Sequence, residues 1–219
     1  MSKAIVIDYY TDVLCVWAWI AQPRLEELER QWQGQVEVRH RYLDIFGNAH
    51  PKIRDRWGTE DGFANFSTHV REAVGAYPEI DVNPGVWLQQ PPTTSLAAHL
   101  YIKAAQTSLG REEAEKYALA IRHAFFLDAR DIGHTETLLE LAAGSGIAPD
   151  ALQGAIADGT ALAALSADLR DAAGQHVHGS PTWVLNEGRL VLFGIVGYRI
   201  LHANIEEVLR RDVDGASWC

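Results

Sequence analysis

The sequence has little cysteine, no excess of positive charge and no long apolar run. Its 219 residues include two cysteines and one methionine, and 19 lysines and arginines stand against 29 aspartates and glutamates. The formal net charge of −10 argues against a nucleic-acid-binding protein, which would carry a basic face. Apolar stretches such as residues 191–196 fall far short of the roughly 20 residues that a bilayer-spanning helix needs. We therefore expect neither a nucleic acid nor a membrane as a partner.

The two cysteines, Cys15 and Cys219, lie almost at opposite ends of the chain. Two cysteines cannot build a disulfide framework, so both are expected to be thiols in a reducing compartment. The first three residues lead directly into an apolar, strand-like segment, which leaves no room for the apolar core and cleavage site of a secretory signal. With 47% hydrophobic and 22% charged residues, the chain is typical of a globular protein. We expect a cytoplasmic location.

Both ends of the chain have the pattern of an α/β fold. Residues 4–9 are short, apolar and β-branched, as in a central strand that is covered on both faces. Apolar residues at helical spacing predict a helix after this strand, which Pro23 should kink, and residues 36–42 predict a second strand. Strand, helix and strand in this order imply a right-handed parallel βαβ unit. At the other end, residues 183–185 and 190–193 predict a hairpin, followed by a final amphipathic helix.

The middle of the chain shows helical patterns and little strand signal. We expect helices over residues 112–126, 135–143, 149–157 and 161–173, and a further helix that begins at Leu96. The proline-containing segments 83–85 and 89–92 cannot lie inside a helix. The simplest interpretation of this region is a helical insertion that covers the sheet.

Cys15 is placed where the first strand ends and the first helix begins. The first N–H groups of a helix have no intrahelical partners and carry partial positive charge, which stabilises a thiolate. Because the thiolate is the nucleophilic form, this position predicts a reactive cysteine. A buried cysteine that only packs as a small apolar residue is the alternative, and position alone does not separate the two.

A second candidate feature is the segment 179–182, in which Ser180 and Pro181 directly precede the hairpin. A proline that enters a strand lies at an edge or at the strand start, and an X–Pro bond can adopt the cis form. A cis bond would turn the backbone N–H and C=O of Ser180 toward an extended thiol-containing substrate. The alternative is a turn proline that only begins a strand, and the sequence leaves the cis state open.

Together, the βαβ and ββα order, the thiol at the helix start and the Ser-Pro-Thr segment resemble the thioredoxin fold. The long helical insertion resembles the DsbA-like branch and, within it, the FrnE-like proteins, whose Cys-Pro-Trp-Cys stretch is similar to residues 12–20. The resemblance covers about residues 4–210 and implies an α/β thioredoxin fold with a large helical insertion domain. The implied thioredoxin-like domain comprises residues 1–60 and 165–219, and the implied insertion comprises residues 61–164.

The chain departs from this family at the motif itself, where Cys15, Val16, Trp17 and Ala18 replace Cys-X-X-Cys. In a dithiol enzyme the second thiol expels the first from the mixed disulfide. With Ala18 in the second position that intramolecular step is impossible. Dithiol oxidase activity is therefore not expected.

Three hypotheses remain. In the first, which we favour, the protein is a thiol-disulfide oxidoreductase in which Cys15 is the catalytic monothiol and glutathione, or another external thiol, resolves its mixed disulfides. In the second, the protein is similar to kappa-class glutathione transferases and 2-hydroxychromene-2-carboxylate isomerases, in which the residue at the helix start, usually serine, polarises the glutathione thiol. In the third, the fold is a non-catalytic binding module. We expect the partner to be a disulfide-bearing protein or a small thiol, and a homodimer is one of the oligomeric states left open.

We expect the substrate to contact Trp17, Ala18, Thr93, Thr94, Ser180 and Pro181. The two threonines belong to a segment that resembles a loop which approaches the cysteine in the relatives, although helix capping alone would explain Thr94. His178 stands just before Ser180 and is expected to border the site. The nine histidines show no spacing typical of a metal centre, so we expect no metal. Cys219 is a candidate distant resolving thiol, with a frayed terminus as the alternative.

Overall fold

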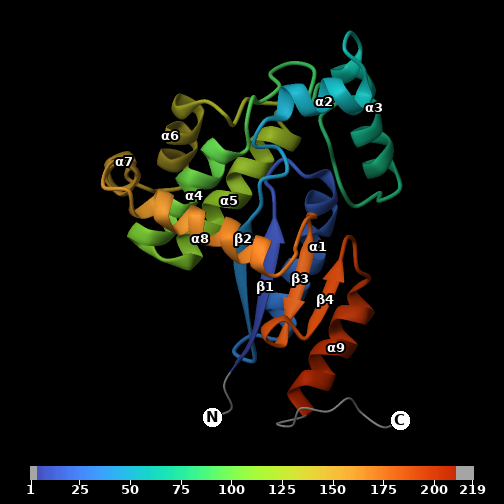
Figure 1. Cartoon of the computed structure of the whole chain (residues 1–219), viewed down its shortest axis with the longest axis vertical. Coiled ribbons are helices and arrows are strands. Elements are labelled where there is room, and N and C mark those ends of the chain that lie inside the picture. Colours follow the sequence, from blue (N-terminus) through green and yellow to red (C-terminus); the bar gives the residue numbers. More distant parts are fainter. Residues whose placement is uncertain (1–3, 211–219) are drawn as a thin grey trace.

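The computed structural model describes residues 4–210, and its centre is one four-stranded sheet in the order β2-β1-β3-β4. β1 (Ile5–Thr11) pairs in parallel with β2 (Val36–Tyr42) and antiparallel with β3 (Thr182–Leu185). β3 pairs antiparallel with β4 (Leu190–Phe193). The strands predicted at both ends of the chain are therefore confirmed, and they join into a single sheet (Figure 1).

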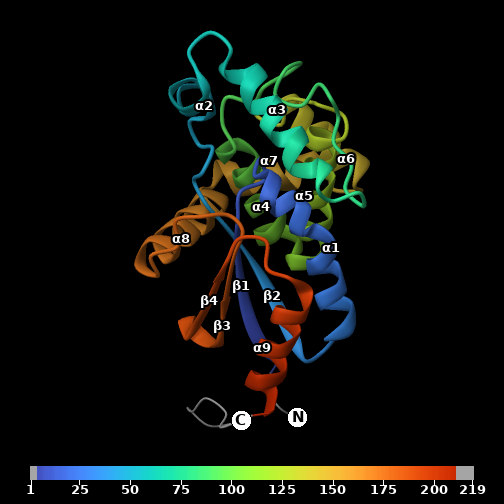
Figure 2. The same cartoon turned by 90° about the vertical axis from the view of Figure 1, so that its right-hand side faces the viewer.

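Helices cover both faces of this sheet. α1 (Val16–Gln31) and α9 (Tyr198–Arg210) pack on one face, and α8 (Thr160–Gly174) lies on the other (Figure 2). The alternation along β1 explains this arrangement, because successive side chains point to opposite faces. Ile7 and Tyr9 pack with α1 and α9, whereas Tyr10 packs with Ala172 of α8. α1 continues through Pro23 without ending there.

The helices between β2 and β3 form the helical insertion, although α2 and most of α8 lie outside the bounds 61–164 that the sequence indicates. α4 lies at its centre, where it contacts α5, α7 and α8. The predicted bounds are confirmed for four helices to within one residue, and the helix starting at Leu96 is also present. The insertion helices other than α8 are α2 (Ala49–Trp57), α3 (Gly62–Gly75), α4 (Leu96–Leu109), α5 (Arg111–Phe126), α6 (Thr135–Gly144) and α7 (Pro149–Ala157).

Two helices of the insertion, α2 and α3, were not predicted from the sequence pattern. α2 contains Pro51 and buries only Ala49 and Ile53, so it has almost no apolar face of its own. It packs against α3, which in turn contacts α1. The stability of α2 therefore comes from tertiary contacts, which a local pattern does not show. In Figure 1 the two helices form a cap over the end of the sheet from which α1 starts.

In the part of the chain that the structure describes, no helix combines the length and the apolar character needed to cross a bilayer.

Candidate active site

Cys15 occupies the N-cap position of α1, directly after the β1 strand and a three-residue connection. Its backbone is extended, with φ of −78° and ψ of 114°. Its N–H group donates to the carbonyl of Asp12 over 3.0 Å, and its own carbonyl accepts the N–H groups of Ala18 and Trp19. The predicted position of the thiol at the helix start is confirmed.

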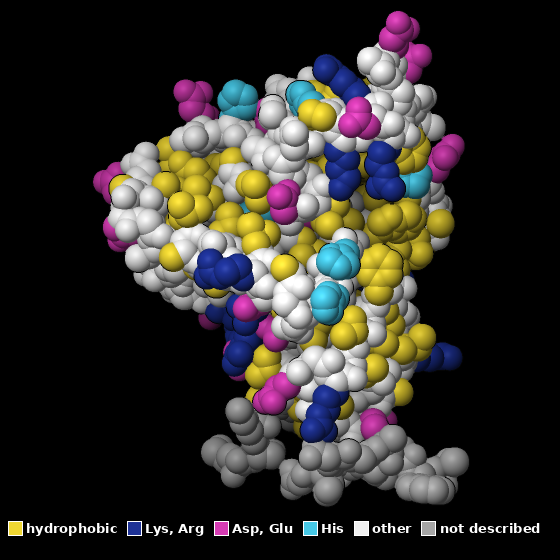
Figure 3. Space-filling view, viewed as in Figure 1, with side chains coloured by type: hydrophobic (Ala, Val, Ile, Leu, Met, Phe, Trp, Pro, Cys, Tyr) yellow, Lys and Arg dark blue, Asp and Glu magenta, His cyan; other side chains and the backbone are white. Residues whose placement is uncertain are grey.

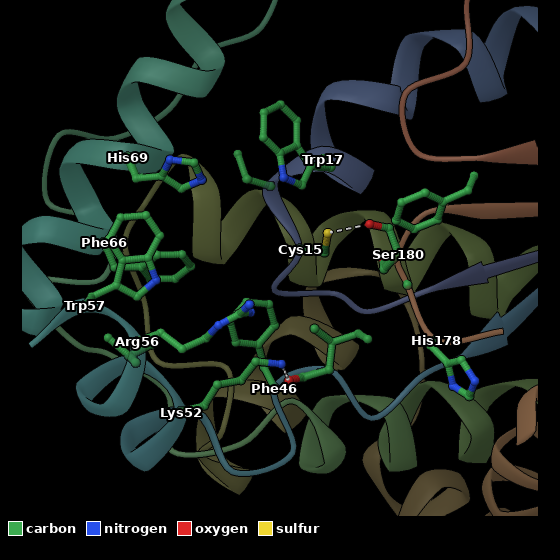
Figure 4. A pocket seen from close by; sticks show the side chains of 15 residues that line it. Cys15, Trp17, Phe46, Lys52, Arg56, Trp57, Phe66, His69, His178 and Ser180 are labelled. Atoms are coloured by element: carbon green, nitrogen blue, oxygen red, sulfur yellow. Dashed lines mark hydrogen bonds between the residues drawn. The ribbon is translucent and has the colours of Figure 1, made fainter. Parts of the chain in front are cut away.

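The Ser180-Pro181 segment lies directly beside this thiol. The peptide bond between Ser180 and Pro181 is cis. The Sγ atom of Cys15 donates a hydrogen bond to the carbonyl oxygen of Ser180 over 3.1 Å, as the dashed line in Figure 4 shows. Pro181 also accepts a hydrogen bond at its carbonyl, from Gly194. The two segments singled out in the sequence, 165 residues apart, are therefore in contact.

Burial is the main influence on the Cys15 thiol, since only 6% of this residue is exposed. Burial raises the pKa of the Cys15 thiol, and the negative charge of Asp12 raises it further. Hydrogen bonds with the Ser180 side chain and with the backbone of Ala18 and Trp17 lower the pKa by less. The expectation that the helix start stabilises a thiolate is wrong for this resting state, because desolvation outweighs the helix N–H groups. Cys15 is a neutral thiol that donates to Ser180.

Cys15 nevertheless borders a cavity of about 440 Å³, within the range of small-molecule sites. Lys52 and Arg56 extend into this cavity from α2, and His69 of α3 and His178 also line it (Figure 4). Among the described residues, no aspartate or glutamate lines the cavity. Figure 3 shows basic and histidine side chains beside an apolar surface on this side of the molecule. The aromatic lining residues are Trp17, Phe46, Trp57, Phe66 and Phe193.

Two of the cavity's cationic side chains are held in different ways. Lys52 donates from Nζ to the carbonyl of Ile45 and lies 5.1 Å from the ring centre of Phe46. Burial lowers the pKa of Lys52. Arg56 is exposed at the surface of α2 and is free of such an anchor in the hydrogen bonds found within residues 4–210. His69 packs against the indole of Trp57, with ring centres 4.7 Å apart.

The predicted substrate-contacting residues fall into two groups. Trp17 and Ser180 line the cavity, as does His178. Ala18 lies beneath, 1% exposed, and gives its N–H group to Cys15. Pro181 is the neighbour of Ser180 but does not itself line the cavity.

Thr93 and Thr94 are placed away from the cavity. The side-chain oxygen of Thr94 accepts the N–H group of Leu96, the first residue of α4, whereas Ser95 at the N-cap position makes no capping hydrogen bond with its side chain. The carbonyl of Thr93 accepts the N–H group of Ala49, at the start of α2, and its side chain borders a separate hollow near α6. Both residues therefore build the loop between α3 and α4 rather than the surface around Cys15. Cys219 lies outside the described residues.

Sequence reasoning missed Lys52, Arg56 and His69 because it missed the two helices that carry them. A signal was present in α3, where Phe66, Val70 and Val74 recur every fourth residue and are buried. Within residues 4–210, no group of three or more histidine, cysteine, aspartate or glutamate side chains is arranged to hold a metal ion.

With this geometry in place, comparison with known proteins identifies the family. The family description of the DSBA-like thioredoxin domain matches residues 6–206. The chain belongs to this family. Because the match runs through both terminal segments and the insertion, it confirms the thioredoxin fold with a helical insertion.

Individual relatives of this DsbA-like chain are distant. A curated relative, the ClpXP adapter protein SpxH of Halalkalibacterium halodurans, is 23% identical over 215 residues, which cover 94% of this chain and 68% of the relative. A putative protein disulfide isomerase from Nitrosomonas europaea has a TM-score of 0.80 and 16% identity, covering 96% of this chain and all of that one.

Two further solved structures share the fold. The cytosolic disulfide reductase DsbM from Pseudomonas aeruginosa, solved with GSH, has a TM-score of 0.69 and 19% identity and covers 94% of this chain and 100% of its own. A 2-hydroxychromene-2-carboxylate isomerase has a TM-score of 0.67 and 17% identity, covering 94% and 96%. The structural neighbours thus include both oxidoreductases and an isomerase.

Proposed function

We propose that this DsbA-like protein is a monothiol thiol-disulfide oxidoreductase and that Cys15 is its nucleophile. The observation that carries the proposal is the position of the Cys15 sulfur, which borders the cavity and contacts the backbone of the Ser180-Pro181 segment. Ala18 replaces the second cysteine of the family motif, so the second half of the reaction needs a thiol from outside.

The reaction has two exchange steps. Cys15 loses its proton, and the thiolate attacks one sulfur of a disulfide, for example a protein-glutathione mixed disulfide. A bond forms between Cys15 and the glutathione sulfur, the original disulfide breaks, and the departing protein thiolate takes up a proton. A second glutathione thiolate then attacks the glutathione sulfur on Cys15. This releases oxidised glutathione and restores the Cys15 thiol.

The charge of the cavity supports glutathione as the external thiol. Glutathione carries two carboxylates and one ammonium group at neutral pH and is therefore a net anion. The protein is acidic overall, at −10, yet Lys52 and Arg56 line the cavity and no acidic residue within the described range does. Such local charge of the opposite sign attracts and orients an anionic ligand. A cytoplasmic location, where reduced glutathione is abundant, is part of this proposal.

Mass spectrometry of a Cys219→Ser variant tests the proposal directly, because Cys15 is then the single thiol. After incubation with oxidised glutathione we expect one glutathione on the peptide that contains Cys15, and we expect added reduced glutathione to remove it. The matched control is Cys15→Ser, in which Cys219 alone can react. Absence of the adduct in the native protein, when the same protein acquires it in denaturant, would contradict the proposal.

A second candidate function is glutathione-dependent isomerisation or transfer. It is favoured by the neutral state of Cys15, which donates a hydrogen bond and thus resembles a hydroxyl group at that position. In this case glutathione is activated rather than attacked, and Cys15→Ser keeps the activity although no adduct can form. An unreactive Cys15 together with an empty cavity would instead favour a binding module; the SpxH relative is described as an adapter protein.

A further inference from the structure

Asp12 is a fully buried carboxylate that the exchange steps above do not use. It lies three residues before Cys15, directly after β1, and is 0% exposed. Its Oδ1 atom accepts the N–H group of Leu14 over 2.9 Å. Its Oδ2 atom accepts the N–H groups of Ile45 and Phe46 over 3.1 and 2.9 Å, and the hydroxyl group of Ser95 over 2.8 Å. A buried carboxylate is stable only when donors surround it, and these four hydrogen bonds stabilise the charged form of the Asp12 side chain.

The donors to this carboxylate come from separate walls of the site. Leu14 belongs to the connection that carries Cys15, and Ile45 and Phe46 line the cavity opposite it. Ser95 directly precedes α4 of the insertion. One side chain therefore fixes the distance between the cysteine and the facing cavity wall.

The backbone of Asp12 connects the cysteine loop to a further segment of the site, the one that contains Ser180. Its N–H group donates to the side-chain oxygen of Ser180 over 3.0 Å, and Ser180 is the residue whose carbonyl accepts the Cys15 thiol. The carbonyl of Asp12 accepts the N–H group of Cys15 itself. The loop that precedes the cysteine is thus bonded to Ser180 through the Asp12 N–H group, and the cysteine is bonded to Ser180 through its sulfur.

His99 of α4 completes the arrangement. Its Nε2 atom accepts the N–H group of Val13 over 3.1 Å, so the ring carries its proton on Nδ1. The Nε2 atom is 3.8 Å from Oδ1 of Asp12, and both side chains are fully buried. The N–H groups of all residues from 12 to 15 are consequently bonded within the protein, and two of them reach side chains from distant parts of the chain.

We propose that Asp12 is the positioning residue of this site: its carboxylate joins the cysteine loop to the facing cavity wall and to α4, and it places a negative charge behind the sulfur. Asp12 contacts neither the cavity nor the sulfur, so it acts through Cys15 and the wall rather than on substrate. The charge also has a direct effect, because it adds to burial, the larger cause, in raising the pKa of the Cys15 thiol. The rate of thiol-disulfide exchange at Cys15 therefore depends on how α4 of the insertion packs against Asp12.

The test uses Asp12→Asn in the Cys219→Ser protein and measures alkylation of Cys15 by iodoacetamide against pH. Loss of the charge should lower the midpoint of the alkylation curve below that of the parent protein, because a nearby negative charge raises the pKa of the thiol. Asp12→Glu keeps the charge but displaces the donors, so its midpoint should stay high while glutathione exchange slows.

Asp168→Asn is the matched control. Asp168 is also buried, 1% exposed, and accepts from Lys103 over 2.6 Å and from the N–H group of Tyr42 over 3.0 Å. Asp168 is not among the groups that mainly shift the pKa of the Cys15 thiol. The control should lose stability and leave the midpoint unchanged. If Asp12→Asn behaves as the control does, with lower stability and the wild-type midpoint, Asp12 is structural only and the proposal fails.

Ser95→Ala provides a milder variant should Asp12→Asn not fold. It removes one of the four donors, and amide hydrogen exchange at Ile45 and Phe46 should then become at least about threefold faster, since the same oxygen holds both. Unchanged exchange at these amides would overturn the proposal. Alkylation and hydrogen exchange need no glutathione, so failure of the positioning role is distinguishable from failure of the proposed activity, which the glutathione adduct reports.

Discussion

The thiol of Cys15 donates to the carbonyl oxygen of Ser180 across 3.1 Å, and this contact joins the start of α1 to the segment that leads into β3. As a donor the sulfur is protonated, and a protonated thiol is a poor nucleophile. Cys15 is therefore unreactive as a nucleophile until its thiol loses the proton. The first prediction concerns the pH at which this occurs.

Alkylation of Cys15 should be slow at neutral pH and should have its midpoint above that of an ordinary cysteine, which is about 8.5. The reason is that burial raises the pKa of the thiol, so the reactive thiolate fraction at pH 7 is smaller than in a free cysteine. The rate of iodoacetamide addition to Cys219→Ser across pH 6–11 measures the midpoint, with the denatured protein as reference. A native midpoint below the denatured one contradicts the prediction.

Ala18→Cys should restore a dithiol site. Ala18 lies three residues after Cys15, in the first turn of α1, where residues at this spacing are neighbours, and it is buried with Cys15 in one core. The added thiol can attack the mixed disulfide, so we expect a disulfide between Cys15 and the introduced cysteine, and a much shorter-lived glutathione adduct. Non-reducing peptide mapping detects the disulfide.

Ala21→Cys is the control for that variant, since Ala21 is equally buried on the same helix but packs in the other core, against the sheet. Its thiol should leave the lifetime of the Cys15 adduct unchanged. Equal effects of the two introduced cysteines would show that the resolving thiol does not act within the site.

The structure also predicts a loss of stability in mild acid. Burial lowers the pKa of His99 to about 4, and the nearby charge of Arg122 lowers it too, while Asp12 and Asp168 act in the opposite direction. Between the unfolded value of about 6.5 and the folded value, the unfolded chain binds the additional proton, so stability falls as pH decreases through this window. The loss amounts to about 3 kcal/mol for this group when the window has been crossed.

His99→Gln isolates this contribution because glutamine keeps an oxygen that can accept the Val13 N–H group but does not titrate. Urea unfolding at pH 7 and at pH 4.5 should show a smaller difference in the free energy of unfolding for the variant than for the wild type. A difference of the same size would mean that other groups cause the acid sensitivity.

The sequence predicted those parts of the site that lie next to strands. Cys15 follows one strongly apolar segment and Ser180-Pro181 precede another, and these two segments are the neighbouring strands β1 and β3. The helix α2 could not be predicted in this way, because Ala49 and Ile53 are its only buried residues and depend on a distant partner. Its partner α3 does carry a helical pattern of buried apolar residues, which the sequence interpretation overlooked. The ionisation state of Cys15 was predicted wrongly for a related reason. The helix start is a local feature, whereas the desolvation that opposes it comes from packing across the whole site.

The last prediction concerns Arg56, which the cap brings to the cavity. Arg56→Gln should raise the concentration of oxidised glutathione needed for half-maximal adduct formation by about threefold to tenfold, the range expected for an exposed charge that contacts a carboxylate. Arg54→Gln is the matched control, since Arg54 belongs to the same helix and is also exposed but does not line the cavity. Both variants remove one positive charge from the protein, so a change in overall attraction affects them equally. The difference between the two should shrink in high salt, because exposed charges are screened. If the two variants respond alike at low salt, the cation at position 56 does not recognise the anion, and the charge of the cavity gives no support to glutathione as its ligand.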